Sequence, residues 1–145
     1  MQRSYVSAVV LFAVVLVAAL AVSGANSRLT DRGDYIVNHV ALCADCHTPK
    51  LAGGKPDLKR KLGGAPIMFK PTVQVPDWRN RAPNLTSSGF LNKWTDAQLA
   101  KFLMTGIGPD GAKADLPMPQ YRLDEQDAKS VTAYLRCLPP VRQAP

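Results

Sequence analysis

The sequence Cys43-Ala44-Asp45-Cys46-His47 places two thiols three positions apart and an imidazole directly after the second thiol. This spacing is typical of covalent attachment of a c-type haem. In such a site the two thiols form thioethers with the haem vinyl groups, and the histidine binds the iron from one face. The pattern therefore predicts one covalent haem c, held by Cys43, Cys46 and His47.

Two other uses of a Cys-x-x-Cys pair are a redox dithiol and half of a zinc site. A zinc site needs two more ligands, and the only other cysteine and histidine are Cys137 and His39. A thioredoxin-like dithiol lies beside a βαβ pattern, which this sequence does not show. Haem attachment is favoured over both. Cys137 falls late in an apolar helical pattern, so we expect a buried free thiol.

A methionine is the expected second ligand, because a thioether opposite His47 gives the iron six ligands and favours ferrous iron. The candidates are Met68, Met104 and Met118. Met104 lies among the core-facing residues of a predicted helix, and the apolar run around Met68 indicates a core or lining position. Met118 stands between two prolines, whose restricted φ favours a fixed presentation of the thioether. Met118 is therefore the predicted ligand. His39 is rejected because it precedes the attachment site on the same helix.

The first 25 residues form an apolar leader. Residues 6–22 are apolar except for one serine, Arg3 precedes them, and residues 23–25 are small, as a signal peptidase prefers. Residues 6–25 are also long enough to cross a bilayer as a hydrophobic helix. We therefore expect residues 1–25 to be a signal peptide or a transmembrane anchor, and residues 26–145 to be the haem domain. Either alternative places the domain in the periplasm, and the second anchors it to the inner membrane.

The formal net charge of +7 is concentrated in one segment. Residues 50–81 carry eight basic and two acidic side chains, whereas residues 82–145 carry seven basic and six acidic ones. Nucleic acid is a poor partner for an exported haem protein. An acidic redox partner or anionic lipid head groups fit better. A merely solvated basic loop is an open alternative.

The apolar periodicity predicts an all-α domain with three main helices and no internal repeat. The first helix should begin near Thr30 or Asp31, either of which can cap it, and lead into the attachment site. Its apolar surface comprises Tyr35, Ile36, Val40 and Leu42. Residues 48–82 contain nine glycines and prolines, which break any long helix. There we expect one helical turn at 57–62 and a small β-hairpin from residues 65–69 and 73–75.

The second and third helices have clear end signals. Thr95 with Gln98 forms a capping box at the start of the second helix, and Gly106 stops it. The third helix opens at Asp124 and ends at the prolines 139–140.

Four stretches carry a resemblance to a known family: residues 33–37 before the attachment site, residues 81–86, residues 94–98, and residues 117–119 with 133–140. In their order and spacing they resemble the class I cytochrome c family from about residue 30 to residue 141. The chain is similar to the single-haem modules of bacterial periplasmic dehydrogenases. The resemblance implies a class I cytochrome c fold in which the first and last helices cross, with Gly33 and Tyr35 near Tyr134.

The resemblance also implies contacts around the haem. The carbonyl of Pro83 would accept the Nδ1 proton of His47, which fixes the imidazole ring and tunes its donor strength. Polar groups near Asn84 or Trp94 would meet the haem propionates, although a helix-flanking core aromatic is the preferred interpretation of Trp94.

Electron transfer is the function that these observations favour, with no side chain that makes or breaks bonds. The domain would be a shuttle, or a subunit of a membrane-associated respiratory or dehydrogenase complex, and would meet redox proteins through an acidic docking face on the partner. The alternative is haem-based catalysis or gas sensing, as in a peroxidase, which needs an open sixth position on the iron. Met118 would fill that position.

Overall fold

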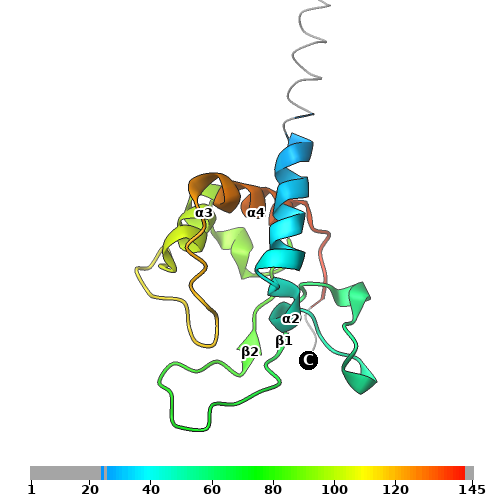
Figure 1. Ribbon diagram of the computed structural model, residues 1–145, viewed down its shortest axis with the longest axis vertical. Coiled ribbons are helices and arrows are strands. Elements are labelled where there is room, and N and C mark those ends of the chain that lie inside the picture. The colour runs from blue at the N-terminus through cyan, green and yellow to red at the C-terminus, as the bar shows by residue number, and fades with distance from the viewer. Residues whose placement is uncertain (1–23, 25, 143–145) are drawn as a thin grey trace, which may run out of the picture.

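A computed structural model describes residue 24 and residues 26–142. In chain order the elements are a helix through residues 26–35 that continues as a π-helical turn Ile36–Val40, α2 Cys43–His47, β1 Ala65–Pro66, β2 Arg81–Ala82, α3 Asp96–Thr105 and α4 Glu125–Cys137 (Figure 1). Short 3₁₀ turns lie at Ala52–Gly54, Leu58–Arg60 and Phe90–Lys93. The mostly helical architecture predicted from the sequence is confirmed.

The predicted leader, residues 1–25, lies outside the described residues except for Gly24. The choice between signal peptide and anchor therefore stays a prediction. Within residues 26–142, no helix combines the length and the apolar character that a membrane span requires.

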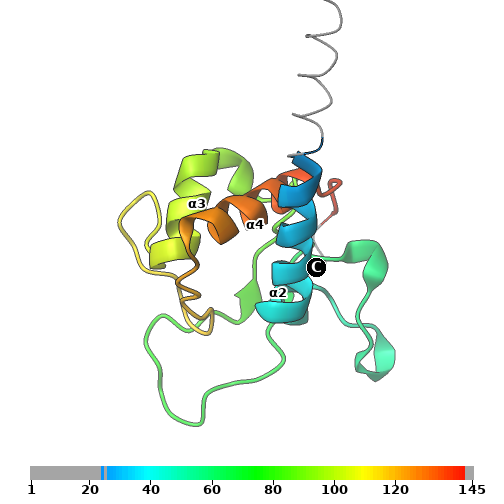
Figure 2. The ribbon, with the colours of Figure 1, turned by 45° about the horizontal axis from the view of Figure 1, so that its top comes forward.

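The N-terminal helix crosses α4 at very close range (Figures 1 and 2). A Cβ on Gly33 would lie 2.1 Å from the carbonyl oxygen of Ser130 and 2.6 Å from Cβ of Tyr134. Next to this point, Arg32 donates two hydrogen bonds of 2.8 Å to the carboxylate of Asp127. The expected crossing, with Gly33 near Tyr134, is confirmed.

The predicted start of this helix is wrong, because residues 26–30 are already helical. The hydroxyl of Thr30 donates to the carbonyls of Asn26 and Ser27, at 3.2 and 2.9 Å, so Thr30 is inside the helix. A threonine hydroxyl satisfied by a preceding carbonyl does not cap. The predicted apolar surface is also only partly buried: Ile36 and Val37 are in the core, whereas Tyr35, Val40 and Leu42 are half exposed.

The ends of α3 and α4 form as the sequence indicates. The amide of Gln98 donates to the hydroxyl of Thr95, and the amide of Thr95 donates to the Gln98 side chain, which completes the capping box. Gly106 ends α3 in the left-handed conformation at φ +70°. Asp124 caps α4 by accepting a bond of 2.7 Å from the amide of Asp127. The core between these helices and the N-terminal helix comprises Ile36, Val37, Leu62, Leu85, Leu91, Leu99, Ala100, Leu103, Ala128, Val131 and Leu135.

The small sheet pairs different residues from those predicted. Ala65 pairs with Ala82 and Pro66 with Arg81, in antiparallel register, so residues 73–75 are not the second strand. Prolines at positions 71 and 76 lack the amide proton that a strand ladder needs, and Val73 is 69% exposed. The chain between the two strands instead projects from the domain as a long loop (Figure 1). The predicted turn at 57–62 is present as the 3₁₀ turn that Asp57 caps.

Two expectations of burial are also wrong. Cys137 is exposed, because it lies two positions beyond the buried Leu135 and so about 200° further round α4. Met68 is 77% exposed, because it stands on the projecting loop directly after β1.

Candidate functional site

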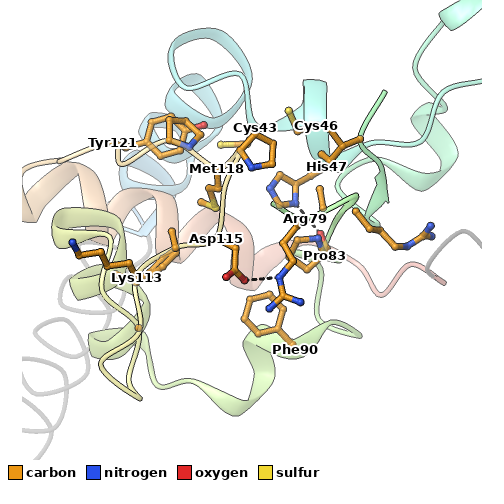
Figure 3. A pocket seen from close by; sticks show the side chains of 18 of the residues that line it. Cys43, Cys46, His47, Arg79, Pro83, Phe90, Lys113, Asp115, Met118 and Tyr121 are labelled. Carbon is orange, nitrogen blue, oxygen red and sulfur yellow. Dashed lines mark hydrogen bonds and ion pairs between the residues drawn. The ribbon is translucent and has the colours of Figure 1, made fainter. Parts of the chain in front are cut away.

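A cavity of about 320 Å³ joins three segments that are far apart in the sequence: α2, the chain around β2, and the loop after α3. It brings together Cys43, Cys46, His47 and Met118, the four residues predicted to hold the haem (Figure 3). The walls are largely apolar, and they include Leu42, Ile67, Ala82, Pro83, Phe90, Trp94, Phe102, Pro117, Pro119 and Tyr121.

The local fold of α2 presents the attachment motif to this cavity. Leu42 takes a left-handed conformation, with φ +51° and ψ +37°, between the π-helical turn and α2, and so redirects the chain. In the helix that follows, residues three and four positions apart lie on the same face. Cys43, Cys46 and His47 have this spacing, and all three side chains line the cavity.

The His47 ring is held in one orientation by the backbone. Its Nδ1 lies 2.8 Å from the carbonyl oxygen of Pro83. Because a carbonyl only accepts, Nδ1 carries the proton and Nε2 keeps a free lone pair. His47 is only 6% exposed, and burial lowers its pKa while the bond to Pro83 opposes that shift. Burial thus favours the neutral ring, and the lone pair on Nε2 is available to bind a metal.

Met118 reaches the cavity from the loop between α3 and α4. The Met118 and His47 side chains point into the same space from two different elements (Figure 3). The amide of Met118 donates to the carbonyl of Asp115 at 3.0 Å, which closes a tight turn before the methionine. The other candidates do not line the cavity: Met104 packs against the core, and His39 is an exposed residue stacked on Tyr35.

Asn84, near which polar groups were expected to meet the haem propionates, does not line the cavity. Its side-chain oxygen accepts from the amide and the hydroxyl of Thr86, at 2.8 and 2.7 Å. Its amide nitrogen donates to Ser88 and, at 2.7 Å, to the carbonyl of Val141. The side chain is thus engaged with the chain that returns after α4. Trp94 does line the cavity, with its ring between Phe90 and Phe102.

The sequence-based site did not include Tyr121, Arg79 and Asp115, which also line the cavity. Tyr121 donates to the carbonyl of Ala41 at 2.9 Å, and burial together with Cys43 raises its pKa. Burial likewise raises the pKa of the Cys43 thiol. The sequence signal that could have placed Tyr121 at the cavity is its position three residues after Met118.

Arg79 and Asp115 form an ion pair that no local pattern indicates, because they are 36 positions apart.

The donor set fits a covalent haem. Two thiols, an imidazole with a free Nε2 and a thioether face one largely apolar cavity, and these are the groups that attach and ligate haem c. A metal site made of His, Cys, Asp and Glu alone is not formed among the described residues.

Comparison with known proteins gives the family. The model of the cytochrome c family matches residues 32–139. A diheme cytochrome c-type protein of Cereibacter sphaeroides is 30% identical over 116 residues, which are 77% of this chain and 36% of the relative. A fructose dehydrogenase cytochrome subunit of Gluconobacter japonicus is 33% identical over 118 residues, 75% of this chain and 22% of the relative.

A cytochrome c subunit of alcohol dehydrogenase (quinone) from Gluconobacter oxydans is 29% identical over 139 residues, 81% of this chain and 26% of the relative. The chain thus spans between about a fifth and a third of the length of these curated relatives. With the family model covering most of its length, and with the attachment motif facing the cavity, this chain belongs to the cytochrome c family.

Proposed function

We propose that the protein carries electrons through one covalent haem c, attached at Cys43 and Cys46 and ligated by His47 and Met118. The observation that carries the proposal is the meeting of these four side chains in one cavity. When bound, the haem would supply the redox chemistry by cycling between ferric and ferrous iron. With three cysteines, the chain has one Cys-x-x-Cys-His site and so attaches one haem.

The protein's own residues act by orientation and by exclusion of water. The carbonyl of Pro83 keeps Nδ1 of His47 occupied, so that only Nε2 would be available to the iron of a bound haem. The aromatic rings of Phe90, Trp94 and Phe102 pack edge to face and give the cavity an apolar wall that disfavours water. Two fixed ligands reduce the rearrangement that accompanies each electron transfer.

Haem-based catalysis or gas sensing is the alternative, and the placement of Met118 argues against it. An enzyme of that kind keeps the sixth position open or weakly held. Here a thioether faces the cavity that His47 faces, and His39, the second histidine of the chain, is on the surface.

We further propose that the domain works outside the cytoplasm as the electron-carrying part of a dehydrogenase system. This assignment is supported by the similarity to relatives that are named as cytochrome subunits of fructose and alcohol dehydrogenases. The basic segment 50–81 supports docking to an acidic surface of a redox partner, because exposed charge of one sign steers association with the opposite sign. Lys55, Lys59 and Lys70 of this segment are exposed.

The first experiment is the absorption spectrum of the reduced protein, with and without carbon monoxide. For the wild type we expect a covalently retained haem and no rapid change on addition of carbon monoxide, because Met118 would ligate the iron. Met118→Ala should keep the haem and bind carbon monoxide rapidly. The matched control is Met68→Ala, which removes an exposed methionine outside the cavity and should behave like the wild type.

Each contrary result has its own meaning. Rapid and complete binding of carbon monoxide by the wild type would replace electron transfer with catalysis or sensing. Wild-type behaviour of Met118→Ala would show that another group ligates the iron. Haem that is extracted by acidified organic solvent would contradict attachment at Cys43 and Cys46.

A further inference from the structure

An ion pair beside the cavity joins two loops that are far apart in the sequence. Nε of Arg79 donates to a carboxylate oxygen of Asp115 at 2.8 Å, and the amide of Arg79 donates to the carbonyl of Leu116 at 2.7 Å. Both Arg79 and Asp115 line the cavity, and Figure 3 shows their bond beside it. The base of the projecting loop is therefore fastened at two points to the segment that leads to Met118.

Asp115 links this contact to the methionine through its backbone. Its carbonyl accepts the amide of Met118 at 3.0 Å, while its carboxylate accepts from Arg79. A shift of Asp115 therefore moves the turn that presents the thioether. Two residues beyond Met118, the Gln120 side chain donates to the carbonyl of Thr105 and anchors the far end of the segment.

We infer that Arg79 and Asp115 are positioning residues that keep Met118 at the iron. The inference rests on the proposed function, since it concerns how firmly the proposed ligand is held. The ion pair holds the turn of residues 115–118 in the arrangement in which the Met118 side chain lines the cavity that His47 also lines. When the pair is broken, the turn keeps its fold but opens more often, and an external ligand replaces Met118 more readily.

The size of the effect follows from exposure. The two side chains are 67% and 44% exposed, so the pair works in a screened environment. Exposed pairs change an equilibrium by about fivefold at most, and salt weakens them further. The backbone bond from Arg79 to Leu116 persists in side-chain variants, so Met118 should become labile rather than lost.

The test measures binding of imidazole to the oxidised protein, followed by the absorption spectrum. Arg79→Gln and Asp115→Asn should each raise the apparent affinity for imidazole about two- to fivefold. The double charge reversal Arg79→Asp with Asp115→Arg should return the affinity toward the wild-type value. Added salt should raise the affinity of the wild type and leave the single variants unchanged. The control, Arg60→Gln, breaks the 2.7 Å pair with Asp57 in the same basic segment and should have no effect.

Two outcomes would overturn the inference. One is an unchanged affinity in Asp115→Asn when circular dichroism shows a folded protein. The other is an effect of Arg79→Gln that is equally large when Asp115→Asn is already present, because Arg79 would then act on the haem by its own charge. If Met118→Ala opens the iron while Asp115→Asn does not, only this inference fails. If Met118→Ala changes nothing, the proposed ligation fails first.

Discussion

Replacing Gly33 by alanine tests whether the crossing of the N-terminal helix and α4 organises the domain. Alanine is favoured over glycine in a helix by about 1 kcal/mol, so propensity alone predicts a gain. The new Cβ, however, would lie 2.1 Å from the carbonyl oxygen of Ser130 and 2.6 Å from Cβ of Tyr134. Neither atom belongs to the flexible end of a side chain, so the helices must separate. Overpacking of this kind costs about 1–3 kcal/mol of stability. Because two backbones must separate here, we expect a cost at or above the upper end of this range.

We therefore expect a net loss of about 2 kcal/mol in the free energy of unfolding of the haem-containing protein. With a urea dependence of about 2 kcal/mol per molar, the midpoint should fall by about 1 M. The matched control is Ser27→Ala, on an exposed part of the same helix, which should change stability by less than about 0.5 kcal/mol. A midpoint for Gly33→Ala at or above that of the wild type would refute the steric reasoning.

Two further predictions concern packing and charge. Leu99→Ala, at a core position that is 2% exposed, should cost about 2–5 kcal/mol in urea unfolding, whereas Leu58→Ala, at a position 74% exposed, should cost less than about 0.5 kcal/mol. The hydrogen bonds from Arg32 hold the pKa of Asp127 below its ordinary value. The stabilisation is therefore present above about pH 4 and is lost as the pH falls through the lowered pKa. Arg32→Gln should lower the unfolding midpoint at pH 6 more than at pH 2.5, and an equal loss at both values would contradict this linkage.

Features that depend on neighbouring residues could be predicted from the sequence. The capping box of Thr95 and Gln98, the stop at Gly106 and the cap at Asp124 are all made by bonds that span three or four positions. The same is true of the attachment motif, whose spacing places its side chains on one face of a short helix. The bond from His47 to Pro83 joins distant segments, and it was expected only through the resemblance to a family.

Features that depend on the packing of distant segments could not be predicted in this way. The partner strand at Arg81–Ala82 follows from how the long loop closes on the domain, not from the β propensity of residues 73–75. The sequence gives no sign that the side-chain amide of Asn84 donates to the carbonyl of Val141, in the chain after α4. Cys137 fits an apolar helical pattern, yet its angle around α4 leaves it outside.

The chain after α4 also decides where the folded unit ends. The carbonyl of Val141 accepts from Asn84 and Ser88, and Cγ1 of Val141 would lie 2.7 Å from a Cβ added to Gly63. The last helix is therefore not the boundary of the module. A cut or a fusion joint placed directly after Cys137 would remove a partner from the amide of Asn84, the residue next to Pro83, and would weaken the support behind the histidine. Any transplant of this domain into another protein needs to carry the chain through Val141.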